Sequence, residues 1–101
     1  MKLLTKELEE RLKDFPLYSQ KDKGDDAVVI CKFFNPVGTW KWYVLEGEKV
    51  GEDYTFFGLV DGFEREYGYF MLSELESVRL PFGLKIERDI LFEECKISDI
   101  R

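Results

Sequence analysis

The fold is decided by residues 39–72, which read TWKWYVLEGEKVGEDYTFFGLVDGFEREYGYFML. Three apolar and aromatic runs in this stretch have the length and composition of β-strands, at 39–45, 54–61 and 67–72. A polar segment with two glycines, 46–52, separates the first two runs and predicts a hairpin loop. Short strands joined by short polar turns predict a mainly antiparallel sheet.

The residues before this stretch add a helix and a further strand. Residues 5–14 carry apolar side chains at helical spacing, with Thr5 as the cap and Pro16 as the stop. Residues 27–34 form a β-branched, apolar run with the length of a buried strand. Because several of these strands are apolar on both faces, we expect the sheet to be covered on both sides or curled around itself.

The residues after it add a second helix and a last strand. Ser73-Glu74-Leu75-Glu76 matches a capping box, which predicts a short helix near 73–79 with Ser73 as its cap. Residues 84–92 alternate apolar and charged side chains, which predicts a strand. Within it we expect Arg88 and Asp89 to form an ion pair at the edge of the sheet. The expected architecture is α+β: an N-terminal helix, a mainly antiparallel sheet of four to five strands and a second short helix.

Size and composition favour one compact domain over residues 1–101. The chain is 45% apolar and 16% aromatic, enough to build a core without disulfides or metals. No apolar run reaches the roughly 18 residues that span a bilayer, and the N-terminus becomes charged too early for a secretory signal. We therefore expect a cytoplasmic protein with no membrane partner.

The chemistry available to the chain is limited. No histidine is present, which removes the commonest general base, the commonest transition-metal ligand and every Ser-His or Cys-His arrangement. Cys31 and Cys95 lie far apart without a CxxC neighbour, and Cys31 sits in an apolar run, so we expect a buried free thiol. We predict no catalytic residue, no metal site and no cofactor.

Negative charge is concentrated in residues 46–76. This third of the chain holds nine carboxylates against two cations, a formal charge of −7, while the whole chain carries −6. Apart from Glu74 and Glu76 at the predicted helix cap, the acids fall in two turns, 46–53 and 61–66. They would form one surface if both turns lay at the same end of the sheet.

Three interpretations of these acids stay open. They form a solvated rim that keeps the protein soluble, a site for Mg²⁺ or Ca²⁺, or a surface that docks a basic protein partner. The spacing does not match an EF-hand, so the metal interpretation is the weakest of the three. The candidate partner-binding residues are Glu46, Glu48, Glu52, Asp53, Asp61, Glu64 and Glu66.

The aromatic residues permit an alternative function. Exposed rings on a sheet stack nucleobases, and such a nucleic-acid-associated factor would draw its phosphate contacts from Lys41, Arg79, Lys85 and Arg88. Trp40, Trp42, Phe56 and Phe70 are, however, expected mainly in the core. The local charge is also of the wrong sign for nucleic acid, which is therefore not favoured. A carboxylate- or metal-dependent small enzyme is a remote alternative.

Several segments of the chain, taken together and in order, resemble those of a known protein family. They are residues 1–8, 24–29, 32–36, 56–58, 68–70, 72–78 and 81–89. In these the chain resembles the "domain of unknown function 2958" family of small proteins carried on bacterial plasmids, phages and integrated elements. The resemblance brings no catalytic residues. It implies an accessory protein of mobile DNA, such as an inhibitor of host defence or of a nucleic-acid-handling protein, or a regulator of transfer or replication.

Overall fold

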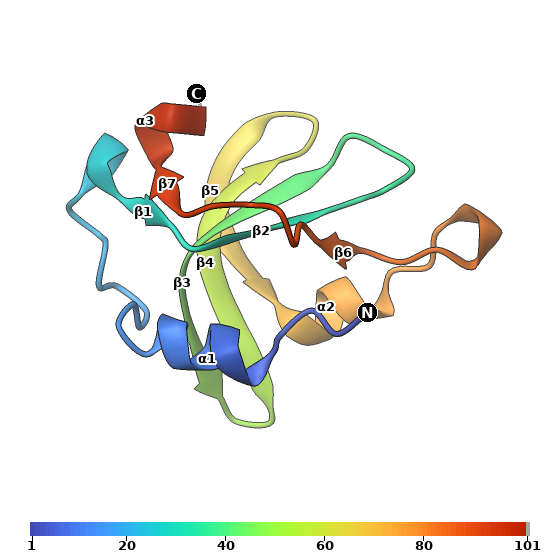
Figure 1. The fold of residues 1–101 in the computed structure, drawn as a ribbon, viewed down its shortest axis with the longest axis horizontal. Helices are drawn as coiled ribbons and strands as arrows, with labels where there is room; N and C mark the ends of the chain where they lie inside the picture. Colours follow the sequence, from blue (N-terminus) through green and yellow to red (C-terminus); the bar gives the residue numbers. More distant parts are fainter. Residues whose placement is uncertain (101) are drawn as a thin grey trace.

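The computed structural model describes residues 1–100 and has an antiparallel five-stranded sheet at its centre (Figure 1). The strand order is β5-β4-β3-β2-β6. The bounds are β2 Cys31–Phe34, β3 Lys41–Val50, β4 Asp53–Asp61, β5 Arg65–Met71 and β6 Glu87–Arg88. A second, two-stranded sheet pairs β1 Val28–Val29 with β7 Cys95–Lys96. The helices are α1 Lys6–Leu12, α2 Leu72–Ser77 and α3 Ile97–Ile100, with 3₁₀ turns η1 Gly24–Asp26 and η2 Pro81–Gly83. The predicted α+β architecture is confirmed.

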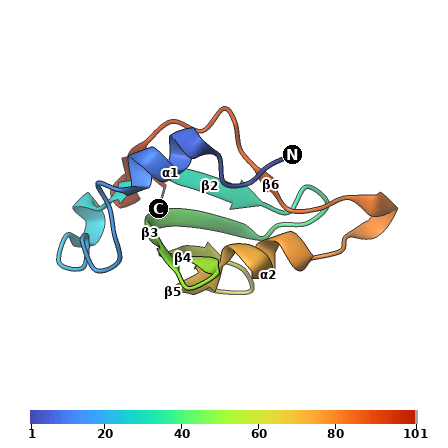
Figure 2. The same ribbon diagram turned by 90° about the horizontal axis from the view of Figure 1, so that it is seen from below.

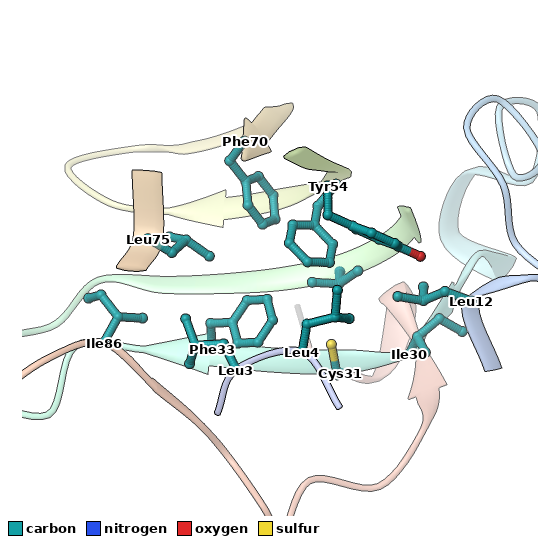
Figure 3. Close-up of a cluster of buried hydrophobic side chains, with 12 residues drawn as sticks. Leu3, Leu4, Leu12, Ile30, Cys31, Phe33, Tyr54, Phe70, Leu75 and Ile86 are labelled. Atoms are coloured by element: carbon teal, nitrogen blue, oxygen red, sulfur yellow. The ribbon is translucent and has the colours of Figure 1, made fainter. Parts of the chain in front are cut away.

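One face of the sheet carries the larger core. Phe33, Val44, Phe56 and Phe70 come from four neighbouring strands, and the rings of Phe33 and Phe56 meet edge to face at 5.4 Å. The N-terminal segment, α1 and α2 close over this face with apolar side chains that include Leu12 and Leu75 (Figures 2 and 3). Burial of this kind contributes roughly 2 kcal/mol for each large apolar side chain, and this cluster holds the larger share of the buried apolar residues.

A smaller core lies on the opposite face. Val29, Tyr43, Leu45 and Leu59 pack there against Ile97 of α3, and all are buried. The short β1–β7 sheet brings the C-terminal segment onto this face, because Val28 pairs with Lys96 and Val29 with Cys95. The prediction that the sheet is covered on both sides is therefore confirmed.

Both cysteines are free thiols, as predicted for Cys31. Cys31 is buried in the larger core, and this burial raises the pKa of its thiol to about 12. The side chain behaves there as a small apolar group.

The N-terminal helix follows its sequence signals. The Oγ1 of Thr5 accepts a hydrogen bond from the Leu8 N–H at 3.1 Å, and Leu12 ends the helix with its side chain fully buried. The second helix starts two positions earlier than its predicted cap implies. Met71, not Ser73, is its N-cap, and the Glu74 carboxylate accepts the Met71 N–H at 2.8 Å.

Three predicted segments differ in the structure. The run 27–34 is divided between β1 and β2. The predicted loop 46–52 is mostly strand, because β3 continues to Val50 and pairs with β4 along its whole length. Of the predicted strand 84–92, only Glu87 and Arg88 form a strand, β6, which pairs with Phe34 and Phe33 of β2.

The predicted ion pair between Arg88 and Asp89 is wrong. Arg88 donates from Nη1 to the carbonyl oxygens of Lys2 and Leu3, at 2.7 and 3.1 Å, and so ties the N-terminal segment to β6. Asp89 lies 3.6 Å from the Nζ of Lys32 instead. Adjacent residues of a strand point to opposite faces, so two neighbours in sequence find separate partners.

Thr55 gives a stability prediction. Its buried Oγ1 has no hydrogen-bond partner among the described residues, so it is desolvated without compensation. We expect Thr55→Val, which keeps the shape, to raise the free energy of unfolding by about 1 kcal/mol in urea titrations. The matched control is Thr5→Val, which removes a capping bond and should lower it by about 1 kcal/mol. A loss of stability in Thr55→Val would show that water satisfies this hydroxyl.

Candidate binding groove on the sheet

A β-bulge in β3 decides which way Glu46 points. Val44 pairs with Gly58 and Glu46 with Phe57, so Leu45 is an extra residue between two consecutive pairs. The insertion places Leu45 and Glu46 on the same face, that of the smaller core, where both line a groove. Without the extra residue Glu46 would share the face of Val44 and enter the larger core.

The Glu46 carboxylate is buried and organises the chain that crosses above it. Its two oxygens accept the backbone N–H groups of Tyr18 and Gln20, at 2.7 and 2.8 Å. The Gln20 side chain is buried too, and it bonds Leu45 O at 2.7 Å and both backbone groups of Val28 at 2.7–2.8 Å. Glu46 was predicted as a partner-binding residue, but its burial removes it from any exposed docking surface.

Three more of the predicted acids have internal partners. Glu48 accepts the Leu17 N–H at 2.9 Å, and Asp61 forms an ion pair with Arg65 at 3.3 Å. Asp53 accepts hydrogen bonds from the Ser73 hydroxyl and from the backbone N–H of Tyr54 and of Ser73. These bonds, the one from the hydroxyl foremost, lower the pKa of Asp53.

The two acidic turns lie at opposite ends of the sheet (Figure 1). One joins β3 to β4 and the other joins β4 to β5, so the nine residues of β4 separate them, about 26 Å at strand spacing. The acids therefore do not form one patch. Glu52, Glu64 and Glu66 stay exposed, and none of them lines the groove. Glu64 and Glu66 flank Arg65, a lining residue, in the sequence.

The groove itself is an open, largely aromatic depression of about 700 Å³ on the smaller-core face. We call it the tyrosine groove and define it by Tyr18, Leu45, Phe57, Leu59, Tyr67 and Tyr69. Its volume lies within the range of about 300–1,000 Å³ that is usual for ligand sites. The strands β3, β4 and β5 supply the floor, and the segment 18–27 supplies one wall.

The rings of the groove contact one another. The Phe57 ring lies 4.9 Å from that of Tyr69 and stacks on that of Tyr67 at 6.2 Å. Tyr18 meets Tyr69 edge-on at 6.4 Å. A hydrogen bond with the Tyr18 side chain, aided by partial desolvation, raises the pKa of Tyr69. All three tyrosines remain more than half exposed, at 67%, 53% and 54% for Tyr18, Tyr67 and Tyr69.

Tyr18 takes an unusual backbone conformation to reach this place. Its φ of 74° lies in the left-handed region, which costs a residue with a side chain roughly 1 kcal/mol or more. The bond from its N–H to Glu46 fixes that conformation. The exposed ring is thus held over the groove by a buried carboxylate.

Charged groups of both signs line the tyrosine groove. They are Lys21, Asp25, Glu46 and Arg65. Arg65 donates from Nη1 to the Ile100 carbonyl at 3.2 Å and from Nε to Asp61 at 3.3 Å. A lining of this composition suits an apolar or aromatic side chain held in place by a few polar contacts. Within residues 1–100 no group of three or more potential ligands could hold a metal ion. Among these residues no helix has both the length and the apolar character to cross a bilayer.

Comparison with known protein families gives one match for the chain. The model of a family described as "Protein of unknown function (DUF2958)" matches residues 3–99. The chain belongs to this family. No curated protein and no solved structure matches it. The resemblance drawn from the sequence is confirmed as to family, and the DUF2958 description carries no activity that could assign a role to the groove.

Most residues of the groove were not predicted from the sequence. Tyr67 and Tyr69 alternate with charged or small residues in β5, and this period of two was the signal that both rings share a face. Tyr18 and Gln20 lie in the irregular segment between α1 and η1, and no local pattern marks their role. Their positions follow from Glu46, which reaches them across 28 and 26 positions of the chain.

Proposed function

We propose that this chain is a non-enzymatic interaction protein that binds a basic protein partner in the tyrosine groove. The observation that carries the proposal is the exposure of three tyrosine rings in one open groove, whereas Phe56 of β4 and Phe70 of β5 are buried in the larger core on the other face. Tyrosine is enriched at the centres of protein interfaces, because it combines a large apolar ring with a polar tip.

The charge of the chain supports a basic protein as the partner. Glu64 and Glu66 are exposed at the start of β5, on either side of Arg65 in the sequence, and the chain as a whole carries −6. Negative surface charge speeds the approach of a positively charged protein and makes binding sensitive to salt. Lys21 and Arg65 are the cations of the groove lining, and Arg65 is paired with Asp61.

The same charges disfavour single-stranded nucleic acid, the second function considered. Of the cations expected to contact phosphates, Arg88 is engaged by two backbone carbonyls, on the strand at the opposite edge of the sheet from β5. Lys41, Arg79 and Lys85 do not line the groove either. A basic path along the exposed rings is therefore missing from the groove lining, and nucleic-acid binding needs such a path.

The setting of this activity is part of the proposal. The family resemblance favours an accessory protein of a mobile genetic element, acting in the cytoplasm as an inhibitor of a host defence or nucleic-acid-handling protein. An inhibitor of this kind needs no catalytic groups, since it acts by occupying a basic surface. The partner would then be a basic protein whose own site accepts an acidic, aromatic ligand.

Capture from host lysate followed by reconstitution tests the proposal. Proteins captured by the wild-type chain are identified, purified and titrated against it in about 50 and 500 mM salt. We expect a basic partner whose affinity falls at least about tenfold between the low and the high salt concentration. We also expect the affinity to fall at least about tenfold in the double variant Tyr67→Ala/Tyr69→Ala. Glu64→Lys combined with Glu66→Lys should also weaken it about tenfold.

The matched control carries the same charge change away from the groove, in Glu7→Lys combined with Glu93→Lys, both exposed. It should bind like the wild type, apart from a modest general effect of net charge. Equal losses of affinity in both charge variants would show that Glu64 and Glu66 contribute only non-specific electrostatic attraction. Binding that ignores the two tyrosines, or a preference for labelled single-stranded DNA or RNA in the same titration, would overturn the proposal.

A further inference from the structure

The outer edge of β5 is a long and regular open strand edge. β5 lies at the end of the strand order and pairs with β4 through all seven of its residues, without a shift in register. Its sequence, REYGYFM, is charged only at Arg65 and Glu66, at its first two positions, and contains no proline, lysine or bulge. These are the devices by which edge strands usually avoid pairing with other chains. The opposite edge, β6, has only two residues.

Two hydrogen bonds show which backbone groups of β5 face outward. The Met71 N–H bonds the Glu74 carboxylate rather than β4, so Met71 faces the edge. On β3, the Gly47 N–H bonds Phe15 O and so points away from β4, which directs the backbone groups of its partner Phe56 toward β5. Because orientation alternates along an antiparallel pair, Phe70 faces inward, whereas Arg65, Tyr67 and Tyr69 face outward.

The outward-facing residues are also those that line the tyrosine groove. Arg65, Tyr67 and Tyr69 present their side chains to the groove and their N–H and C=O groups to the edge beside it. On the opposite face of β5, Glu66 is exposed, and a Cβ on Gly68 would meet nothing within 4 Å. A strand added at this edge would therefore meet tyrosine rings on one face and open space beside a carboxylate on the other.

We propose that the β5 edge takes an extended segment of the basic partner as a sixth strand of the sheet. This inference rests on the proposed function and specifies its binding mode. In this segment apolar residues alternate with lysine or arginine. The apolar side chains enter the groove beside Tyr67 and Tyr69, and the basic side chains extend over Gly68 toward Glu66 on the opposite face. Glu64 and Glu74 flank the two ends of the strand, and this distribution of charge is what selects a basic segment.

The direct test is a titration of the isotope-labelled wild-type chain with a blocked eight-residue peptide that alternates valine with lysine. We expect resonance shifts along β5 and amide hydrogen exchange slowed at least about tenfold at Tyr67 and Tyr69, because their N–H groups become bonded. The peptide that alternates valine with glutamate is the matched control and should bind at least about tenfold more weakly. Equal binding of both peptides, or unchanged exchange at both amides on binding, overturns the proposal.

Two substitutions at one position separate strand addition from contact with the ring alone. Tyr67→Ala removes the ring, whereas Tyr67→Pro removes the ring and the outward N–H. Proline is tolerated on an edge strand where its missing N–H faces solvent, and the bonds to β4 come from neighbouring residues. We expect the lysine-valine peptide to bind Tyr67→Pro about tenfold more weakly than Tyr67→Ala.

The outcomes distinguish this inference from the proposed function. Equal affinities in the two variants, both below the wild type, overturn strand addition but keep the groove as the binding site. Affinities equal to the wild type in both overturn the proposed function as well. A concentration-dependent dimer of the wild-type chain that is absent in Tyr67→Pro would assign the edge to a second copy instead. Should Tyr67→Pro fail to fold, the exchange rates of the wild-type chain decide the question.

Discussion

Replacing Glu46 with alanine is expected to lower the free energy of unfolding by about 3 kcal/mol. The carboxylate is 2% exposed and accepts two backbone N–H groups, and charge-assisted bonds of this kind are stronger than neutral ones. Its removal leaves the N–H groups of Tyr18 and Gln20 without acceptors. The bond that holds Tyr18 at a φ of 74° is also lost, so we expect the segment 18–27 to leave the groove.

Glu48→Ala is the matched control for this prediction. Glu48 lies two residues away on the same strand and also accepts a backbone N–H, that of Leu17, but at an exposed position. We expect it to cost less than about 1 kcal/mol, because water replaces the lost acceptor. Urea titrations give both values, and faster amide exchange at Tyr18 and Gln20 should appear only in the Glu46 variant. Equal losses in the two variants would contradict a special role for the buried carboxylate.

Replacing Gly58 with alanine is expected to lower the free energy of unfolding by a similar amount, about 3 kcal/mol. A Cβ at Gly58 would lie 1.9 Å from the carbonyl oxygen of Tyr43, a backbone atom that cannot turn aside as a side chain does. Gly58 pairs with Val44 at the start of the bulge, so the strands must separate where Leu45 and Glu46 turn into the groove.

Its cross-strand partner provides the control. Gly68 lies directly opposite Gly58 on β5, yet a Cβ there would meet nothing within 4 Å. Gly68→Ala should therefore change stability by less than about 0.5 kcal/mol, or raise it slightly by restricting the unfolded chain. Thermal and urea unfolding of the two variants measures the contrast. Comparable stabilities would mean that β3 shifts at the bulge without cost.

The main elements of the fold were predictable because their signals are local. Thr5 caps the first helix, and the apolar runs of β4 and β5 lie within a few residues of their predicted bounds. The length of β3 was missed because residues 46–49 are charged or, at Gly47, lack a side chain. Residues 46–50 form a strand because each of them pairs with one of residues 53–57 of β4.

The candidate site was predictable only in part. The concentration of acids in 46–76 is real, but the structure uses Glu46, Glu48, Asp53 and Asp61 internally and places the two turns at opposite ends of β4. A carboxylate that accepts buried N–H groups and one that meets solvent look alike in a sequence. The difference lies in which distant backbone segment comes within 3 Å.

The sequence by itself determined the class of fold, the family and the absence of histidine chemistry, because composition, period and capping act over neighbouring residues. The tertiary structure alone decided that one inserted residue, Leu45, turns Glu46 under the segment of Tyr18 and Gln20. It also decided that Tyr18, Tyr67 and Tyr69 meet in one groove beside the open edge of β5. Register, strand order and long-range hydrogen bonds set these arrangements, and they depend on residues far apart in the chain.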